Sequence, residues 1–171
     1  MIFNGDGFDY SAEIIEIERN HVSVHLKEKT AVSVESPLSI HLYQGISRGD
    51  KMDLTLQKGV ELGIKEFTPL LTERCGVKLD AKRWQKKTQH WEKVIQSACE
   101  QCGRNLIPTI NPVTSLNDAI NEVTQQSYFL HPETETSFKA LSQIDPQQPL
   151  KLWVGPEGGF SDNEVEQVIQ H

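Results

Sequence analysis

The chain has 171 residues, enough for one domain of ordinary size that buries roughly 70% of its unfolded surface. Its net charge is −7, from 24 acidic and 17 basic side chains. No apolar run approaches the ~18 residues of a transmembrane helix, and no secretory leader opens the chain, which excludes membrane and secreted proteins and predicts a cytoplasmic one. Three cysteines, an odd number, favour reduced thiols over a disulfide framework.

Residues 1–36 have the pattern of short β-strands. Apolar and polar side chains alternate over 8–14 and again over 22–26, with Arg19-Asn20 as turn material between them. Residues 4–7, Asn-Gly-Asp-Gly, are typical of a tight hairpin turn, because glycine takes positive φ without steric cost. Three strands make a poor domain by themselves, so we expect residues 1–36 to be part of a larger β module.

After Ser36-Pro37 the pattern changes to alternating strands and helices. Asp50 is expected to cap a helix that stops at Gly63, Thr114 to cap a shorter one, and Ser161 with Glu164 to form a capping box. Strands are predicted at 38–42, 66–71, 128–130 and 150–154, and a long helix at 80–102. This order predicts an α/β domain with a parallel sheet over 37–171, continuing beyond His171.

The sharpest local signal is the run Gly-Pro-Glu-Gly-Gly at 155–159, between an apolar strand and a capped helix. Such a turn lies at the edge of a parallel sheet where open α/β folds bind ligands, and its glycines let a ligand approach the backbone. The alternative is a tight connection that merely requires positive φ. The run matches neither the dinucleotide fingerprint nor a phosphate loop, so classical NAD and ATP sites are not expected.

Basic residues gather on the long helix. Residues 74–104 hold eight basic and three acidic side chains, a charge of +5, whereas the remaining nine basic and 21 acidic side chains give −12. Helical spacing puts Arg83, Lys86 and Lys87 on one face, which suggests contact with a phosphate backbone. A solvated helix face explains the same stripe. The pair Cys99 and Cys102 is more simply two packed thiols than half of a zinc site, so no metal is predicted.

Six blocks in this order resemble a known family. They are ISRGDKM (46–52), QKGVELG (57–63), TERCGVK (72–78), EQCGRN (100–105), LHP (130–132) and GPEGG (155–159). Together they are similar to the ribosomal RNA small subunit methyltransferase E family, which methylates N3 of a uridine in bacterial 16S rRNA. The resemblance covers essentially the whole chain.

The resemblance implies more than the residues do. It implies a PUA-like β-barrel for RNA, present in part at 1–36, and a SPOUT α/β domain with a trefoil knot at 37–171. It also implies a homodimer that uses S-adenosylmethionine and acts on the small ribosomal subunit. The family's chain continues past the position of His171, so the sequence is expected to be truncated at both ends and of doubtful activity alone.

By position, the resemblance assigns roles to residues of the six blocks. The cofactor-binding residues are expected to be Leu130, His131, Gly155, Pro156, Glu157 and Gly158. The RNA-binding residues are expected to be Arg48, Lys58, Lys78 and Gln101, joined by the helix-face residues Arg83, Lys86 and Lys87. Arg74 or Arg104 is expected to stabilise the uridine anion and Glu61 to accept its proton.

Two alternatives stay open on the residues. A non-catalytic RNA-binding protein would use the basic stripe and the strands equally well, but would not need the glycine-rich turn at 155–159. A SPOUT methyltransferase acting on another RNA, such as transfer RNA, would share the turn, and the choice of substrate is not readable from single residues.

Overall fold

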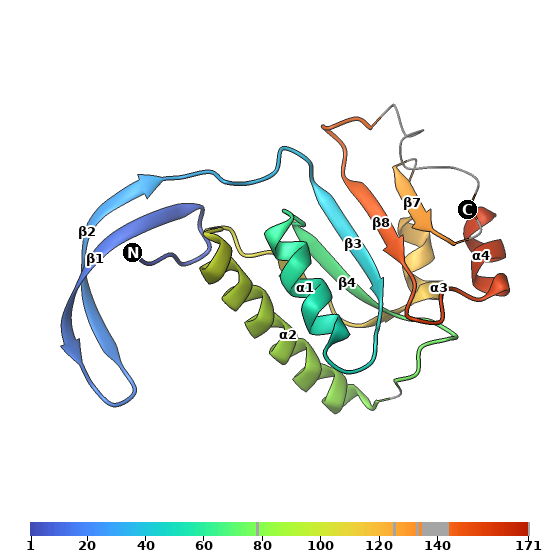
Figure 1. The fold of residues 1–171 in the computed structure, drawn as a ribbon, viewed down its shortest axis with the longest axis horizontal. Coiled ribbons are helices and arrows are strands. Elements are labelled where there is room, and N and C mark those ends of the chain that lie inside the picture. The colour runs from blue at the N-terminus through green and yellow to red at the C-terminus, as the bar shows by residue number, and fades with distance from the viewer. Residues whose placement is uncertain (78, 125, 133, 135–143, 171) are drawn as a thin grey trace.

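A computed structural model of the protein describes residues 1–77, 79–124, 126–132, 134 and 144–170. The N-terminal part is a two-stranded antiparallel hairpin of β1 (Phe8–Ile17) and β2 (Val22–Ala31). Ile2 pairs with Tyr10 beside it, so the predicted reversals at 4–7 and 19–20 are both present. The hairpin projects from the rest of the molecule as an arm (Figure 1).

The remaining strands form one parallel sheet within the described residues. They are β3 (Ile40–Gly45), β4 (Glu66–Leu71), β5 (Thr109–Ile110), β6 (Thr114–Ser115), β7 (Ser127–Leu130) and β8 (Leu150–Val154). Their order is β5-β4-β3-β8-β7, with β6 paired to β4, and every pairing is parallel. The predicted α/β class with a parallel sheet is therefore confirmed.

Helices cover both faces of this sheet (Figure 1). Helices α1 (Lys51–Glu61) and α2 (Ala81–Cys102) pack against Leu42 and Phe67 on one face. On the other face, α3 (Leu116–Ala119), the 3-10 turn η1 (Ile120–Glu122) and α4 (Asp162–Ile169) flank a core that contains Tyr43 and Trp153. Successive residues of β3 thus serve opposite cores, as the alternation of a strand requires.

Two predicted helix caps are wrong in detail. Asp50 begins α1 but its side chain accepts no capping hydrogen bond, because its backbone is already helical (φ −82°, ψ −2°) rather than extended. Thr114 pairs with Leu70 as part of β6, and Ser115 caps α3 instead. Ser161 caps α4 in a full capping box, as predicted, and Asp80, the predicted start of the long helix, caps α2.

The parallel sheet has two distinct edges. At its carboxyl edge, where the strands end, lie the loops after β3, β4, β7 and β8. At its amino edge, where the strands begin, lie the C-terminal ends of α1 and α2, because each helix ends shortly before a strand begins. Two backbone hydrogen bonds join the segments there: the N–H of Lys65 donates to the carbonyl of Ile40, and the N–H of Thr109 donates to the carbonyl of Lys65. The hairpin joins the domain at this amino edge through residues 32–39. The two edges separate the candidate site residues into two groups.

Candidate functional site

The glycine-rich turn at 155–159 lies at the carboxyl edge, between β8 and α4. Only Gly159 has positive φ, +68°. Gly155 is required for space, because a Cβ there would lie 2.9 Å from the carbonyl carbon of Gly159 and 3.0 Å from the nitrogen of Phe160. Gly45 meets the same turn from β3, where a Cβ would lie 2.5 Å from Pro156. The turn is thus folded tightly on itself and on the neighbouring strand.

Buried polar groups hold this turn in place. The carboxylate of Glu164 accepts hydrogen bonds from the backbone N–H of Ser161 and of Glu73, both at 2.8 Å, and the side chain is buried. One carboxylate therefore connects the start of α4 to the loop after β4. Gln44 adds a hydrogen bond from its Nε2 to the carbonyl of Gly155 at 3.3 Å. The two hydrogen bonds that the Glu164 carboxylate accepts fix the backbone at the N-terminus of α4.

A cleft of about 460 Å³ opens on one side of the turn. It is lined by Arg48, Lys51, Arg74, Gly76, Glu157 and Gly158. Arg74 donates from one guanidinium nitrogen to the carbonyls of Gly158 (3.0 Å) and Phe160 (2.9 Å), yet its side chain is 47% exposed. The Arg48 guanidinium packs over the backbone of Gly76 so closely that a Cβ there would overlap it, so any side chain at position 76 would displace Arg48. We call this set the cationic cleft.

Glu157 is the acidic member of the cationic cleft. Its carboxylate accepts from the backbone N–H of Arg48 at 3.1 Å and lies 3.3 Å from the Lys51 ammonium. Hydrogen bonds from its own backbone N–H and that of Arg48, with the nearby Lys51 charge, hold the pKa of Glu157 below its usual value. Glu157 therefore remains ionised and ties the loop after β3 to the turn.

An apolar groove of about 290 Å³ opens on the other side of the turn. It is lined by Phe129, His131, Thr134, Phe160, Val165, Val168 and Ile169. The predicted cofactor-binding residues thus divide: His131 lines this groove, whereas Glu157 and Gly158 line the cationic cleft. Pro156 is buried against Gly45, and Leu130 lies on the opposite face of β7 from Phe129, 43% exposed.

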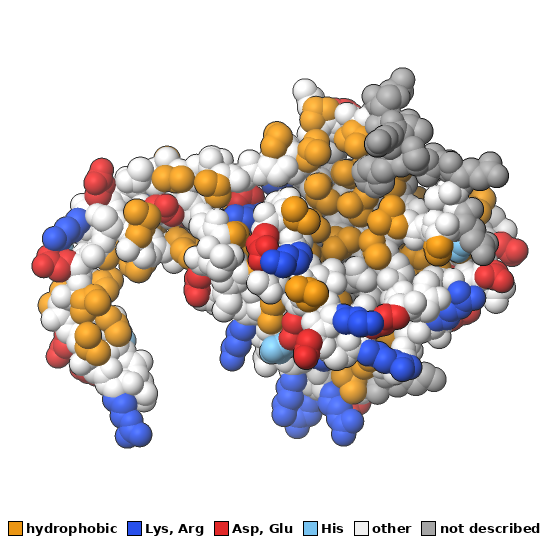
Figure 2. Space-filling model, viewed as in Figure 1, with side chains coloured by type: hydrophobic (Ala, Val, Ile, Leu, Met, Phe, Trp, Pro, Cys, Tyr) orange, Lys and Arg blue, Asp and Glu red, His pale blue; other side chains and the backbone are white. Residues whose placement is uncertain are grey.

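The basic stripe forms an exposed face of α2, which we call the basic face: Lys82, Arg83, Lys86, Lys87 and Lys93. Figure 2 shows several Lys and Arg side chains projecting from the lower edge of the molecule, below α2. Two members have partners: Arg83 Nε lies 3.5 Å from Asp80, and Lys87 lies 5.6 Å from the Trp91 ring. Lys78, also predicted to bind RNA, lies outside the described residues.

A second group of predicted residues lies toward the amino edge. Glu61, the last residue of α1, pairs with Lys58 at 2.7 Å and accepts from Gln57 at 3.2 Å. Gln57 and Gln101 line a groove of about 360 Å³ between α1 and α2. An 11-residue helix is about 16 Å long, so Glu61 is separated from the cationic cleft by the length of α1.

The prediction that Arg104 stabilises a reaction intermediate does not fit its surroundings. The side chain is buried at the amino edge, where it pairs with Glu35 (2.9 and 2.6 Å) and donates to the carbonyls of Val60 and Ile64. These contacts occupy four of its donors inside the protein. The contacts of Arg104 thus all lie at the amino edge, and the structure does not bring it or Glu61 together with the turn.

Sequence reasoning missed three residues of this region. Gly45, Lys51 and Glu164 each contact the turn or line the cleft. Gly45 lies outside the predicted strand at 38–42, Lys51 is only a member of the first block, and Glu164 is predicted only as part of the capping box. The capping box indicated that Glu164 bonds the start of α4. Its second hydrogen bond, from the N–H of Glu73, forms only because the strand order brings the loop after β4 next to α4. Among the described residues, no group of His, Cys, Asp or Glu lies together as metal ligands do, and no helix is long and apolar enough to cross a membrane.

Comparison with known proteins identifies the family. Residues 34–171 match the RNA methyltransferase domain family. The chain is 36% identical over 171 residues to "Ribosomal RNA small subunit methyltransferase E" of Buchnera aphidicola subsp. Schizaphis graminum, covering 99% of this chain and 69% of that protein. The protein of the same name from Bacillus subtilis is 31% identical, with 96% and 68% covered. The chain belongs to the ribosomal RNA small subunit methyltransferase E family.

Solved structures agree with this family assignment. A Legionella pneumophila protein described as a methyltransferase, in complex with its bound cofactor SAM, has a TM-score of 0.93 at 39% identity, covering 99% of this chain and 69% of that one. A ribosomal RNA small subunit methyltransferase E of Neisseria gonorrhoeae, bound to S-adenosyl methionine, has a TM-score of 0.90 at 33% identity, with 98% and 69% covered. The resemblance that the six sequence blocks indicated is confirmed.

Proposed function

We propose that this protein is an S-adenosylmethionine-dependent methyltransferase that methylates N3 of a uridine in 16S rRNA of the small ribosomal subunit. The observation that carries the proposal is the folded glycine-rich turn at the carboxyl edge, flanked by an apolar groove and a cationic cleft. It occurs in a chain of the ribosomal RNA small subunit methyltransferase E family, two of whose structural neighbours were solved with S-adenosylmethionine.

The residues around the turn suit the methyl donor. S-adenosylmethionine supplies an electrophilic methyl group on a sulfonium. The apolar groove, with Phe129, His131 and Phe160, offers ring and aliphatic surface for an adenosine. Gly155 lets the turn fold onto its own backbone, whereas Gly159 has open space where its Cβ would lie, so a ligand can approach the peptide groups there. We assign donor binding to the turn, His131 and the Leu130 strand end.

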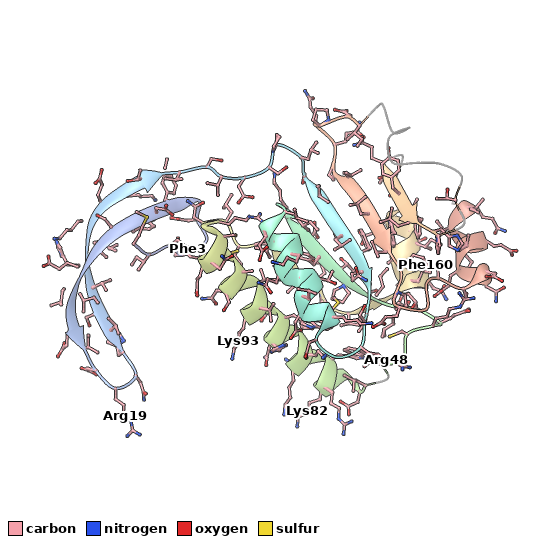
Figure 3. The ribbon with its side chains drawn as sticks, viewed as in Figure 1. Phe3, Arg19, Arg48, Lys82, Lys93 and Phe160 are labelled. Carbon is pink, nitrogen blue, oxygen red and sulfur yellow. The ribbon has the colours of Figure 1, made fainter. Side chains whose placement is uncertain are left out.

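For the RNA we propose a path along one side of the molecule. Figure 3 shows Arg19 at the hairpin tip, Lys93 and Lys82 on α2, and Arg48 at the carboxyl edge in succession. The basic face supplies sequence-independent phosphate contacts between these ends. Lys58 and Gln101 flank the groove between α1 and α2 on the way to the amino edge. The target nucleotide would reach the cationic cleft at the end of this path.

For the chemistry, N3 of a uridine must lose its proton as the methyl group is transferred. Cations placed where the negative charge develops stabilise it. We propose Arg74 for this role, with Arg48 beside it, because both line the cationic cleft next to the turn and Arg74 is held by two backbone carbonyls. Glu61 and Arg104 are not included, because their contacts are at the amino edge. Correct placement of the two reactants supplies much of the rate acceleration.

We extend the proposal to the family's architecture, with a PUA-like barrel that includes residues 1–36, a knotted SPOUT domain over 37–171, a homodimer and a cytoplasmic location. In support, the hairpin has exposed apolar side chains such as Ile15 (67% exposed), and Leu130 and Ile169 are exposed near the carboxyl edge. Such surfaces are usually covered in an assembled protein. Sedimentation of the purified protein measures the oligomeric state.

The decisive test is methyl transfer. The full-length protein that contains this chain is incubated with labelled S-adenosylmethionine and, in parallel, with small-subunit rRNA, intact small subunits or transfer RNA. The modified nucleoside is then identified by mass spectrometry. We expect 3-methyluridine in small-subunit rRNA. Label in transfer RNA alone would assign another substrate, and RNA binding without donor binding in calorimetry would identify a non-catalytic RNA-binding protein.

A further inference from the structure

Arg104 and Asn105 connect the hairpin to the α/β domain at the amino edge. Arg104 joins three segments, because its guanidinium bonds Glu35 in the linker and the carbonyls of Val60 at the end of α1 and Ile64 before β4. The side chains of Arg104 and Glu35 are only 5% and 10% exposed. An ion pair this deeply buried holds its two segments in one geometry, since separating the charges leaves each one without a partner.

Asn105 makes the corresponding contacts to the hairpin itself. Its Nδ2 donates to Asp9 of β1 at 3.2 Å and to the carbonyl of Val32, just after β2, at 2.9 Å. Its own carbonyl accepts from the N–H of Gly7 at 3.2 Å. The residue is 1% exposed. One asparagine thus fixes both strands and the turn that precedes them.

The next two residues close the junction. The side chains of Ile107 and Leu106 pack over Gly5 and Gly7, so that a Cβ on either glycine would lie 3.3 to 3.5 Å from them. Beyond this base the hairpin extends freely, with Ile14, Ile15 and Ile17 exposed by 60% to 71%. Within the described residues, the arm is therefore held at its base by residues 104–107, together with Phe3, which packs against the core beneath α2.

We propose that Arg104 and Asn105 form a clamp that sets the angle of the hairpin to the basic face of α2, so that one RNA contacts both surfaces at once. A ten-residue strand is about 33 Å long. A rotation of about 10° at its base therefore moves the tip by about 6 Å, beyond the range of a hydrogen bond. Arg104 and Asn105 are in this sense positioning residues, and the inference rests on the proposed RNA substrate.

The test measures the arm's position and the reaction separately. Spin labels are attached to Asn20→Cys in the hairpin turn and to Gln89→Cys on α2, in a Cys102→Ser background that removes the partly exposed native thiol. Double electron–electron resonance then measures the distance between the two labels. Cys75 and Cys99 are buried and serve as unlabelled controls. The clamp variants are Glu35→Gln and Asn105→Ala, chosen because Arg104→Ala alone would leave Glu35 buried and unpaired. Glu166→Gln, an exposed carboxylate on α4 away from both the junction and the basic face, is the matched control.

We expect both clamp variants to broaden the distribution of distances between the two labels. We also expect the KM for RNA to rise about tenfold, because an RNA bound to one surface is then no longer held in place to bind the other. S-adenosylmethionine affinity and kcat should stay near native, which a general loss of folding would not allow. The control should behave as the native protein. An unchanged distribution, or a broadened one with unchanged KM, would overturn the proposal. If the native protein transfers no methyl group, the proposed function fails. The clamp is then still tested by the distance distribution and by the affinity for RNA, which the clamp variants should change and the control should not.

Discussion

At position 155 a side chain is excluded by space rather than by backbone conformation. Gly155 has an ordinary φ, but its Cα faces the backbone of Gly159 and Phe160 at contact distance. Gly158 is less constrained, since a Cβ there would lie 3.3 Å from the Cβ of Arg74, a contact that a shift of a few tenths of an ångström relieves. The two glycines of one motif therefore predict different consequences of substitution.

We expect Gly155→Ala to lower the free energy of unfolding by about 1–3 kcal/mol, the usual cost of overpacking, and to weaken S-adenosylmethionine binding at least as much. Gly158→Ala is the matched control and should be much milder. Calorimetric titration with the donor and chemical unfolding measure both effects. Equal donor affinity in Gly155→Ala and the native protein would contradict the assignment of the turn.

His41 predicts a pH dependence of stability. The ring is buried between Tyr43, 4.1 Å away, and Thr68, which bonds its Nε2 at 2.8 Å, and burial lowers its pKa. The unfolded chain then binds a proton near pH 6.5 that the folded protein does not, so stability falls as the pH falls below about 6.5.

Urea unfolding at several pH values checks this prediction. His41→Gln should flatten the loss of stability between pH 6.5 and the lowered pKa of the folded state. His25→Gln, at an exposed hairpin position, is the control and should leave the slope in place. A native protein as stable at pH 5 as at pH 7 would show that His41 is not buried in its neutral form.

At the scale of elements, α4 is coupled to the loop after β4 through one carboxylate. Glu164 completes the capping box with Ser161 and accepts from Glu73 at 2.8 Å. We expect Glu164→Ala to cost about 1–3 kcal/mol, because two buried N–H groups lose their acceptor, and to weaken donor binding through the loosened turn. Glu166→Ala, exposed on the same helix, should be near neutral in both thermal unfolding and donor titration.

The basic face of α2 makes a prediction about salt. Each phosphate contact that is lost should reduce the slope of log affinity against log salt by about 0.7–0.9. Lys86 and Lys93 are exposed, whereas Lys87 packs toward Trp91, so Lys86→Gln and Lys93→Gln should change the slope more than Lys87→Gln. Lys65→Gln, between α1 and β4 and outside the basic face, is the control. A slope unchanged in the double variant of Lys86 and Lys93 would identify the stripe as a solvated face.

At the scale of the whole molecule, the junction between hairpin and sheet predicts a non-additive pair. Arg104→Met should destabilise the protein by about 3–5 kcal/mol, because it leaves Glu35 buried without its partner. Adding Glu35→Leu removes that unpaired charge, so the double variant should be more stable than Arg104→Met alone. A double-mutant cycle by urea unfolding measures the coupling. Additive costs would show that the two side chains do not act together.

The sequence by itself determined the longer elements, the α/β class with a parallel sheet and the family, but it did not assign the short strands β5 and β6 to that sheet. The periodicity of β4, the long α2 and the capping box at Ser161 are local patterns, and local hydrogen bonding fixes them. The glycine-rich turn was placed correctly at a strand end for the same reason. Six short motifs in order were enough to indicate the family that the comparisons confirm.

Only the tertiary structure decided what each motif residue does. Arg74 and Arg104 lie in equally basic motifs, yet Arg74 lines an open cleft and Arg104 is buried against Glu35, 69 residues away in the chain. Glu61 and Glu157 likewise separate to opposite edges of the sheet. Strand order and direction set these neighbours, and no local pattern encodes them, because a charged side chain is buried only where distant segments supply its partners.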